Sequence, residues 1–200
     1  MINKTVFLIL CWIVRAILFF YHPVFIVKGR ENVPKEGRVI ICPNHCGLMD
    51  PAWVIIGLKL GRMPAVISKK ELMKVPVLSS ILRYLKVIPV ERDGTDINAL
   101  KTSMKRLKEG HALLLFPEGT RVKPGMQIEA KGGAMLMAAR TESAVLPVYV
   151  SVKRFPFSPI RCIIGEMYTP PFASSKPTEE EINENTKDMM KRIYALGENV

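Results

Sequence analysis

The sequence is short of acidic residues and of aromatic residues. Its 200 residues include 18 Asp and Glu against 29 Lys and Arg, which gives a net charge of +11 at pH 7. A surface of this sign attracts anionic partners such as nucleic acid, lipid headgroups, coenzyme A or an acidic carrier protein. Aromatic residues make up only 8% of the chain, the basic residues are scattered, and no nucleic-acid-binding motif is present. We therefore expect no nucleic acid among the partners.

Cysteine is also scarce. The four cysteines stand at positions 11, 42, 46 and 162 and form no paired framework, which favours a reducing compartment and a cytoplasmic catalytic domain. Cys42, His45 and Cys46 are close enough in sequence to suggest zinc ligands. A structural zinc site needs four ligands, and no second Cys/His pair follows at the spacing of a zinc finger. We expect no metal and no resident cofactor.

Long uncharged apolar segments are missing too. The longest apolar run, Val6–Tyr21, contains Arg15 and stops at His22 and Pro23. As a helix of about 16 residues it would reach about 24 Å, less than the roughly 30 Å of a bilayer core. An arginine at the bilayer centre costs about 3 kcal/mol, which partial insertion avoids because the guanidinium reaches the interface. We expect residues 1–23 to form a partly inserted membrane-associating helix, with a tilted span or a cleaved signal peptide as alternatives.

Residues 24–200 are long enough for one domain with a sizeable core. Apolar runs bounded by turn residues predict seven strands, at 24–27, 39–42, 64–68, 87–90, 112–116, 145–152 and 160–166. Helical periodicity predicts helices at 50–60, 96–109 and 130–140, and a last helix that begins after the capping pair Thr178 and Glu181. This alternation predicts an α/β fold with a mixed sheet of about seven strands covered by helices.

The segment Asn44–Pro51 carries the first chemical signal. His45 and Asp50 are separated by four residues, so a turn can bring the carboxylate to the imidazole and fix which ring nitrogen carries the proton. The other nitrogen is then free to take a proton from a substrate hydroxyl. Asp50 alone could be a plain helix N-cap, but the histidine beside it favours a catalytic pair.

The segment Phe116–Arg121 carries the second signal and follows the apolar run 112–116, which reads as a buried strand. Gly119 lets backbone N–H groups approach a ligand closely, and Arg121 can grip an anion. The carboxylate of Glu118 cannot attract a phosphate, so we expect it to orient an arginine or a glycerol hydroxyl. The segment is typical of an anion-binding loop.

These two segments resemble the first and third signatures of the glycerolipid acyltransferases of the 1-acylglycerol-3-phosphate acyltransferase family. The match to the third is complete. The first departs from the family at Gly47, where the family usually carries Ser. The segments Val87–Arg92 and Leu146–Tyr149 are similar to the second and fourth family blocks, in the same order and at the same spacing. The resemblance covers residues 24 to 170.

The resemblance implies the same α/β fold and an acyl transfer from acyl-CoA or acyl-carrier protein to 1-acyl-sn-glycerol 3-phosphate. The product would be phosphatidate, made for phospholipid biosynthesis at the cytoplasmic face of the cell membrane. It also implies that His45 and Asp50 are catalytic. The residues that the resemblance assigns to the substrate phosphate are Arg92, Glu118, Gly119, Thr120 and Arg121.

Lys69 and Lys70 are further candidates, on residue type alone, for gripping a phosphate of the donor. Two alternatives stay open. One is an acyltransferase for another lysolipid, which the His45–Asp50 pair would serve equally. The other is a basic membrane-binding protein without catalysis. The sequence makes no prediction of oligomeric state.

Overall fold

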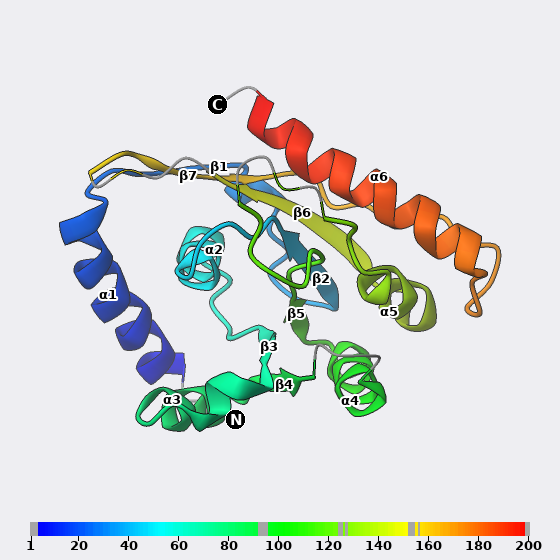
Figure 1. The fold of residues 1–200 in the computed structure, drawn as a ribbon, viewed down its shortest axis with the longest axis horizontal. Helices are drawn as coiled ribbons and strands as arrows, with labels where there is room; N and C mark the ends of the chain where they lie inside the picture. The colour runs from blue at the N-terminus through cyan, green and yellow to red at the C-terminus, as the bar shows by residue number, and fades with distance from the viewer. Residues whose placement is uncertain are drawn as a thin grey trace.

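The protein is described by a computed structural model that covers residues 4–91, 96–123, 126, 128–151, 155 and 157–198. Its strands form one seven-stranded sheet in the order β1-β7-β6-β2-β5-β3-β4 (Figure 1). The pairs are parallel except β6 with β7, which is antiparallel. The predicted mixed sheet is thus confirmed. The strands are β1 (Phe25–Lys28), β2 (Val39–Pro43), β3 (Ala65–Lys69), β4 (Ile88–Val90), β5 (Ala112–Leu114), β6 (Ala144–Val150) and β7 (Ile160–Ile164).

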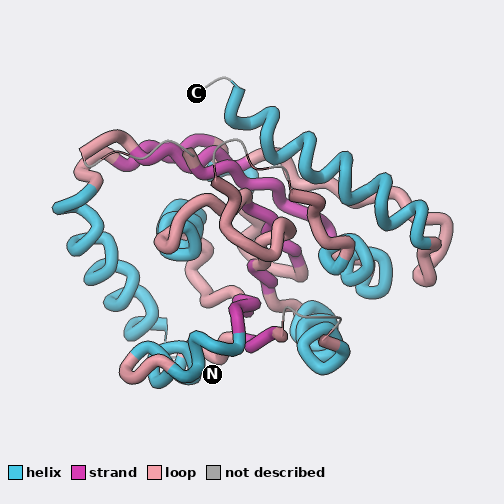
Figure 2. Tube along the Cα trace, in the orientation of Figure 1, coloured by secondary structure: helices cyan, strands magenta, loops and turns pink. Residues whose placement is uncertain are grey.

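Helices cover both faces of this sheet (Figures 1 and 2). One face carries α1 and α2, and the other carries α4, α5 and α6. The α-helices are α1 (Lys4–Tyr21), α2 (Asp50–Leu58), α3 (Leu78–Tyr84), α4 (Ile97–Lys108), α5 (Gly133–Thr141) and α6 (Glu179–Glu198). Two short 3₁₀ segments, Arg30–Asn32 and Lys70–Lys74, follow β1 and β3. The predicted helices are confirmed, whereas α3 was not predicted.

The central strand β2 shows why the sheet is covered on both sides. All five of its residues are buried. Val39 and Ile41 pack with α2, while Ile40 and Cys42 pack with α5 and α6 on the opposite face. A parallel strand with two buried faces is apolar at every position rather than at alternate ones, which is the pattern that this segment has.

The last helix has the start and the packing that its sequence predicts. The backbone N–H of Thr178 donates to Glu181 Oε2 at 2.8 Å, and the N–H of Glu181 donates to Thr178 Oγ1 at 3.2 Å. This capping box satisfies two N–H groups of the first turn. Met189 and Ile193 are fully buried against the sheet, so α6 lies firmly along β6.

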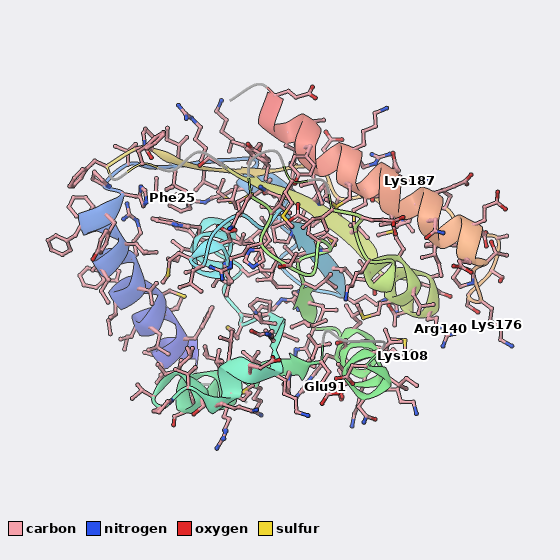
Figure 3. The ribbon with its side chains drawn as sticks, viewed as in Figure 1. Phe25, Glu91, Lys108, Arg140, Lys176 and Lys187 are labelled. Carbon is pink, nitrogen blue, oxygen red and sulfur yellow. The ribbon has the colours of Figure 1, made fainter. Side chains whose placement is uncertain are left out.

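The helix α1 turns its arginine toward the domain. Arg15 donates to the backbone oxygen of Pro23 at 3.2 Å, and its guanidinium lies about 6 Å from the ring centroids of Phe25 and Trp53. Figure 3 shows Phe25 next to the C-terminal end of α1. The charge in the apolar run is therefore held on the inner side of the helix, against α2.

The outer side of α1 is apolar and exposed. Phe7 and Leu18 are buried, but Trp12 and Phe20 are 77% and 75% exposed. Among the described helices, none combines the length and the apolarity needed to cross a membrane. The helix itself is where the sequence predicts it, and its association with a membrane stays a prediction.

Candidate active site

The site lies at the carboxyl ends of β2, β5 and β6, the edge at which parallel α/β sheets bind ligands. Asn44 directly follows β2 and is fully buried. Its side chain accepts from Val150 N at 2.7 Å and donates to Val150 O at 2.9 Å. Through these two bonds, the side chain of Asn44 continues the hydrogen-bonded pairing of β2 with β6 by one residue. His45 therefore lies just beyond the edge of the sheet.

His45 and Asp50 form the pair that the sequence predicts. His45 Nδ1 lies 3.0 Å from Asp50 Oδ2, and the same oxygen accepts the backbone N–H groups of Cys46 and Gly47 at 2.7 Å each. Asp50 is fully buried, and a buried carboxylate needs such donors to offset its desolvation. The N-cap residue of α2 is Met49, so Asp50 serves the preceding loop instead of capping the helix.

Among the described residues, none is hydrogen-bonded to the second ring nitrogen of His45, Nε2. Because Nδ1 faces Asp50, Nε2 is the atom that can take a proton. The imidazole stacks on the ring of Phe116, with 4.2 Å between the ring centroids, and its side chain is 12% exposed. The ring is thus held on two sides and still reaches solvent.

The loop after β5 is bound to the backbone of His45. The N–H of His45 donates to Glu118 Oε2 at 2.7 Å, and the N–H of Val122 donates to the carbonyl of His45 at 2.7 Å. The hydroxyl of Tyr194, on α6, donates to Glu118 Oε1 at 2.5 Å. The two signature segments therefore form one unit, and the carboxylate of Glu118 lies inside it.

Burial is the main cause of the pKa shifts of Glu118 and Tyr194. Glu118 is only 3% exposed, and this burial raises the pKa of its carboxyl, while the donors Tyr194 and His45 N–H oppose the rise. Burial and the bond to Glu118 also raise the pKa of Tyr194. The tyrosine therefore keeps its proton and stays a donor at neutral pH.

The rest of this loop points outward. Gly119 has a φ of 65°, in the left-handed region that favours glycine, and its N–H closes the turn by donating to Phe116 O at 3.0 Å. Thr120 and Arg121 are exposed. Within the described residues, no carboxylate pairs with the guanidinium of Arg121. This cation is available to an anionic ligand.

Of the remaining predicted residues, Lys69 and Lys70 lie elsewhere along the same edge. Arg92 lies outside the described residues. Lys69 is the last residue of β3, and its Nζ lies 3.4 Å from Glu71. Lys70 starts the next turn and pairs with Glu91. Both lysines are thus paired with carboxylates at the surface, and their binding to a donor stays a prediction.

A cavity of about 590 Å³ adjoins the pair, between α4, α5 and the carboxyl ends of β3, β4 and β5. Phe116 connects the two, because the ring that stacks on His45 also lines the cavity. Its volume is within the range of small-molecule sites. The apolar lining side chains include Ile67, Val90, Leu100, Leu115, Leu136 and Met137.

The sequence alone did not indicate two residues of this site. Asn44 belongs to the segment Asn44–Pro51, but the spacing of residues in that segment did not indicate that the side-chain amide of Asn44 hydrogen-bonds to the backbone of β6. Tyr194 was not predicted, because a tyrosine hydroxyl in the last turns of an amphipathic helix is ordinary on a protein surface. Its signal in the sequence was its place directly after Ile193, a member of the apolar stripe of that helix.

Comparison with known proteins identifies the family to which this chain is similar. The sequence model of the family described as Acyltransferase matches residues 24–151. The 1-acyl-sn-glycerol-3-phosphate acyltransferase of Borreliella burgdorferi is 36% identical over 62% of this chain and 49% of that protein. The enzyme of the same name from Bacillus subtilis is 28% identical over 85% of this chain and 86% of that protein. This chain thus spans about half of the first relative and most of the second.

A solved structure is similar over most of the chain. The crystal structure of the 1-acyl-sn-glycerophosphate (LPA) acyltransferase PlsC from Thermotoga maritima aligns with a TM-score of 0.70 and 29% sequence identity. The alignment covers 92% of this chain and 75% of that protein. The seven-stranded sheet with helices on both faces is therefore shared with a lipid acyltransferase.

Proposed function

This chain belongs to the acyltransferase family, and from that premise we propose that it moves a fatty acyl group from a thioester to the free hydroxyl of 1-acyl-sn-glycerol 3-phosphate, forming phosphatidate. One observation carries the proposal. His45 Nδ1 lies 3.0 Å from the buried carboxylate of Asp50, and Nε2 is left for a substrate. A base oriented in this way suits proton removal from an alcohol.

The proposed reaction is a direct transfer. His45 Nε2 takes the proton of the acceptor hydroxyl while the oxygen attacks the thioester carbonyl carbon. The carbon–sulfur bond then breaks, and the thiolate leaves with the proton that His45 gives back. The products are the oxygen ester and a free thiol. During the step the imidazole is cationic, and the adjacent carboxylate of Asp50 stabilises that charge.

The acceptor phosphate is assigned to the loop beside the base. Arg121 presents an exposed cation there, with Gly119 and Thr120 beside it, and charge-assisted bonds from a guanidinium to phosphate are strong. Arg92 remains a predicted second cation for this phosphate. Glu118 remains a predicted residue of this phosphate site, and its carboxylate accepts hydrogen bonds from Tyr194 and from the His45 N–H.

The apolar cavity is assigned to the fatty acyl chain of the donor. Its lining is mainly aliphatic, and burying apolar surface is favourable by about 25 cal/mol per Å². Because Phe116 lines the cavity and stacks on His45, a chain inside the cavity would end near the base. The thioester carbonyl would then lie where the hydroxyl is activated.

The donor is proposed to be acyl-CoA or acyl-carrier protein, and the place of reaction the cytoplasmic face of the cell membrane. Both donors are anionic, as are many lipid surfaces, and the net charge of +11 attracts them. The exposed apolar side of α1, with Trp12 and Phe20, suits partial insertion into a lipid interface.

Product analysis tests this proposal. Purified protein is incubated with lysophosphatidate or with lysophospholipids of other headgroups, each with acyl-CoA and acyl-carrier protein of several chain lengths, and products are identified by mass spectrometry. We expect phosphatidate from lysophosphatidate. Faster transfer to another lysolipid would mean that this lysolipid, and not lysophosphatidate, is the acceptor. No transfer to any of them would favour a basic membrane-binding protein without catalysis.

A further inference from the structure

The last helix of the chain reaches the candidate active site. The hydroxyl of Tyr194 donates to one carboxylate oxygen of Glu118 at 2.5 Å, and the other oxygen accepts the N–H of His45 at 2.7 Å. A continuous set of contacts therefore leads from α6, through the loop after β5, to the backbone of the proposed base.

Close packing fixes where this hydroxyl lies. Ile193, the residue before Tyr194, is fully buried. One turn further along the helix, Gly197 is so close to Tyr149 on β6 that a Cβ atom there would lie 2.4 Å from the tyrosine ring. The last turns of α6 thus pack directly on the strand whose end forms the site. The phenol ring is carried by a rigid element rather than by a loose tail.

We propose that Tyr194 is a positioning residue for acyl transfer, which holds the Glu118 carboxylate so that this carboxylate fixes the backbone of His45. The inference rests on the proposed function, because the effect on turnover needs His45 to be the base. It goes beyond that function by making the C-terminal helix part of the machinery that orients the base.

The physical reason is the isolation of the carboxylate from water. Glu118 is 3% exposed, so each of its oxygens needs a protein donor. If Tyr194 lost its hydroxyl, Oε1 would lose this donor and the carboxylate would rotate or take up a proton. Either change weakens its bond to the His45 N–H. A displacement of the base of about 1 Å can cost about 100-fold in rate.

Other ionisable groups surround this contact and are unchanged in the variants below. His45, in the loop between β2 and α2, and Asp50, the first residue of α2, face the Glu118 carboxylate. Cys46 and Tyr149 face the Tyr194 hydroxyl. Tyr194→Phe therefore directly alters only the link between Tyr194 and Glu118.

The test uses the full chain with Tyr194→Phe, which removes only the hydroxyl. Tyr84→Phe on α3 is the matched control, since Tyr84 is also partly exposed and lies on another element. We expect Tyr194→Phe to lower kcat about tenfold while both KM values stay within about twofold, the pattern of a group that acts in the transition state. Tyr84→Phe should keep wild-type kcat.

A double-mutant cycle with Glu118→Gln separates positioning from general packing. If Tyr194 acts through Glu118, Tyr194→Phe lowers kcat by less than about twofold when Glu118 is already Gln, because coupled residues are non-additive. Full additivity of the two losses, or wild-type kcat in folded Tyr194→Phe, would overturn the proposal.

A second measurement needs no substrate and is independent of the proposed function. Hydrogen exchange of the His45 amide, followed by mass spectrometry, should become about tenfold faster in Tyr194→Phe, because the acceptor of this N–H is less firmly held. Unchanged exchange would refute the link itself. If exchange changes but the wild-type protein transfers no acyl group, the link stands and the proposed function fails.

Discussion

Replacing Asp50 by Asn is the change that isolates the charge of the buried carboxylate. The two side chains have the same shape, so the amide oxygen of Asn can take the place of Oδ2. It then still accepts the N–H groups of Cys46 and Gly47, which lie 2.7 Å from Oδ2 in the wild-type protein. What is lost is the negative charge beside His45.

The expected cost in stability follows from the three hydrogen bonds to this oxygen. Bonds to a charged group contribute about 1.5–3 kcal/mol and neutral ones about 0.5–1.5 kcal/mol, so three conversions cost roughly 3 kcal/mol. For a chain of this size that lowers Tm by about 6–12 °C. Asp50→Ala should be worse, since the partly buried N–H groups of Cys46 and Gly47 would lose their acceptor, at up to about 1–3 kcal/mol each.

The cost in turnover should be much larger. A neutral amide can leave His45 in the wrong tautomer and no longer stabilises the imidazolium, and the same change in serine-protease triads lowers kcat about 10⁴-fold. We expect a loss of about 10³- to 10⁴-fold for folded Asp50→Asn. Asp188→Asn, at an exposed pair with Arg192 on α6, is the control. Folded Asp50→Asn that keeps kcat within about tenfold of wild type would refute the reasoning.

Three further outcomes are expected. Arg121→Ala should raise the KM for lysophosphatidate about tenfold or more and leave the donor KM unchanged, because it removes a charge-assisted contact to the phosphate. An unchanged KM for lysophosphatidate would exclude the role of Arg121 in phosphate binding. Gly133→Leu should shift donor preference to shorter acyl chains in a chain-length series, because Gly133 lines the cavity and a Cβ there meets open space; an unchanged series would exclude the acyl assignment. Because the pKa of Glu118 is raised from 4.5 in the folded protein, the stability that it contributes is present below that value and is lost as pH rises through the folded pKa. Tm of wild type relative to Glu118→Gln should therefore fall as pH rises above about 4.5, and the opposite slope would contradict the burial argument.

The strands and most helices could be predicted because their signals are local. Runs such as Val39–Pro43 are apolar at every position because both faces of the sheet are covered. The helix α3 was not predicted because it is short and only partly buried. Leu78, Ile81 and Leu82 recur at helical spacing, but the helix has only 7 residues and none of them is fully buried. It also begins after Val77, which has a φ of 64°. So short a stripe does not distinguish a helix from an apolar loop.

The contacts of the candidate site also differ in whether local sequence spacing could predict them. The His45–Asp50 pair was predicted because a turn closes four residues, and the structure has it at 3.0 Å. The contact between Glu118 and Tyr194 joins residues 76 positions apart. It depends on where α6 packs along β6, which no local spacing encodes. The role of Glu118 as the acceptor for the His45 N–H likewise required the three-dimensional fold.

The central claim is that His45 is the base of an acyl transfer, and the most direct test is the turnover of His45→Ala. The purified variant is compared with wild type for transfer from acyl-CoA to lysophosphatidate, with His111→Ala, an exposed histidine at the other end of β5, as the control. We expect a fall in kcat of about 100- to 10,000-fold with the fold retained. Near-normal turnover by folded His45→Ala would contradict the account.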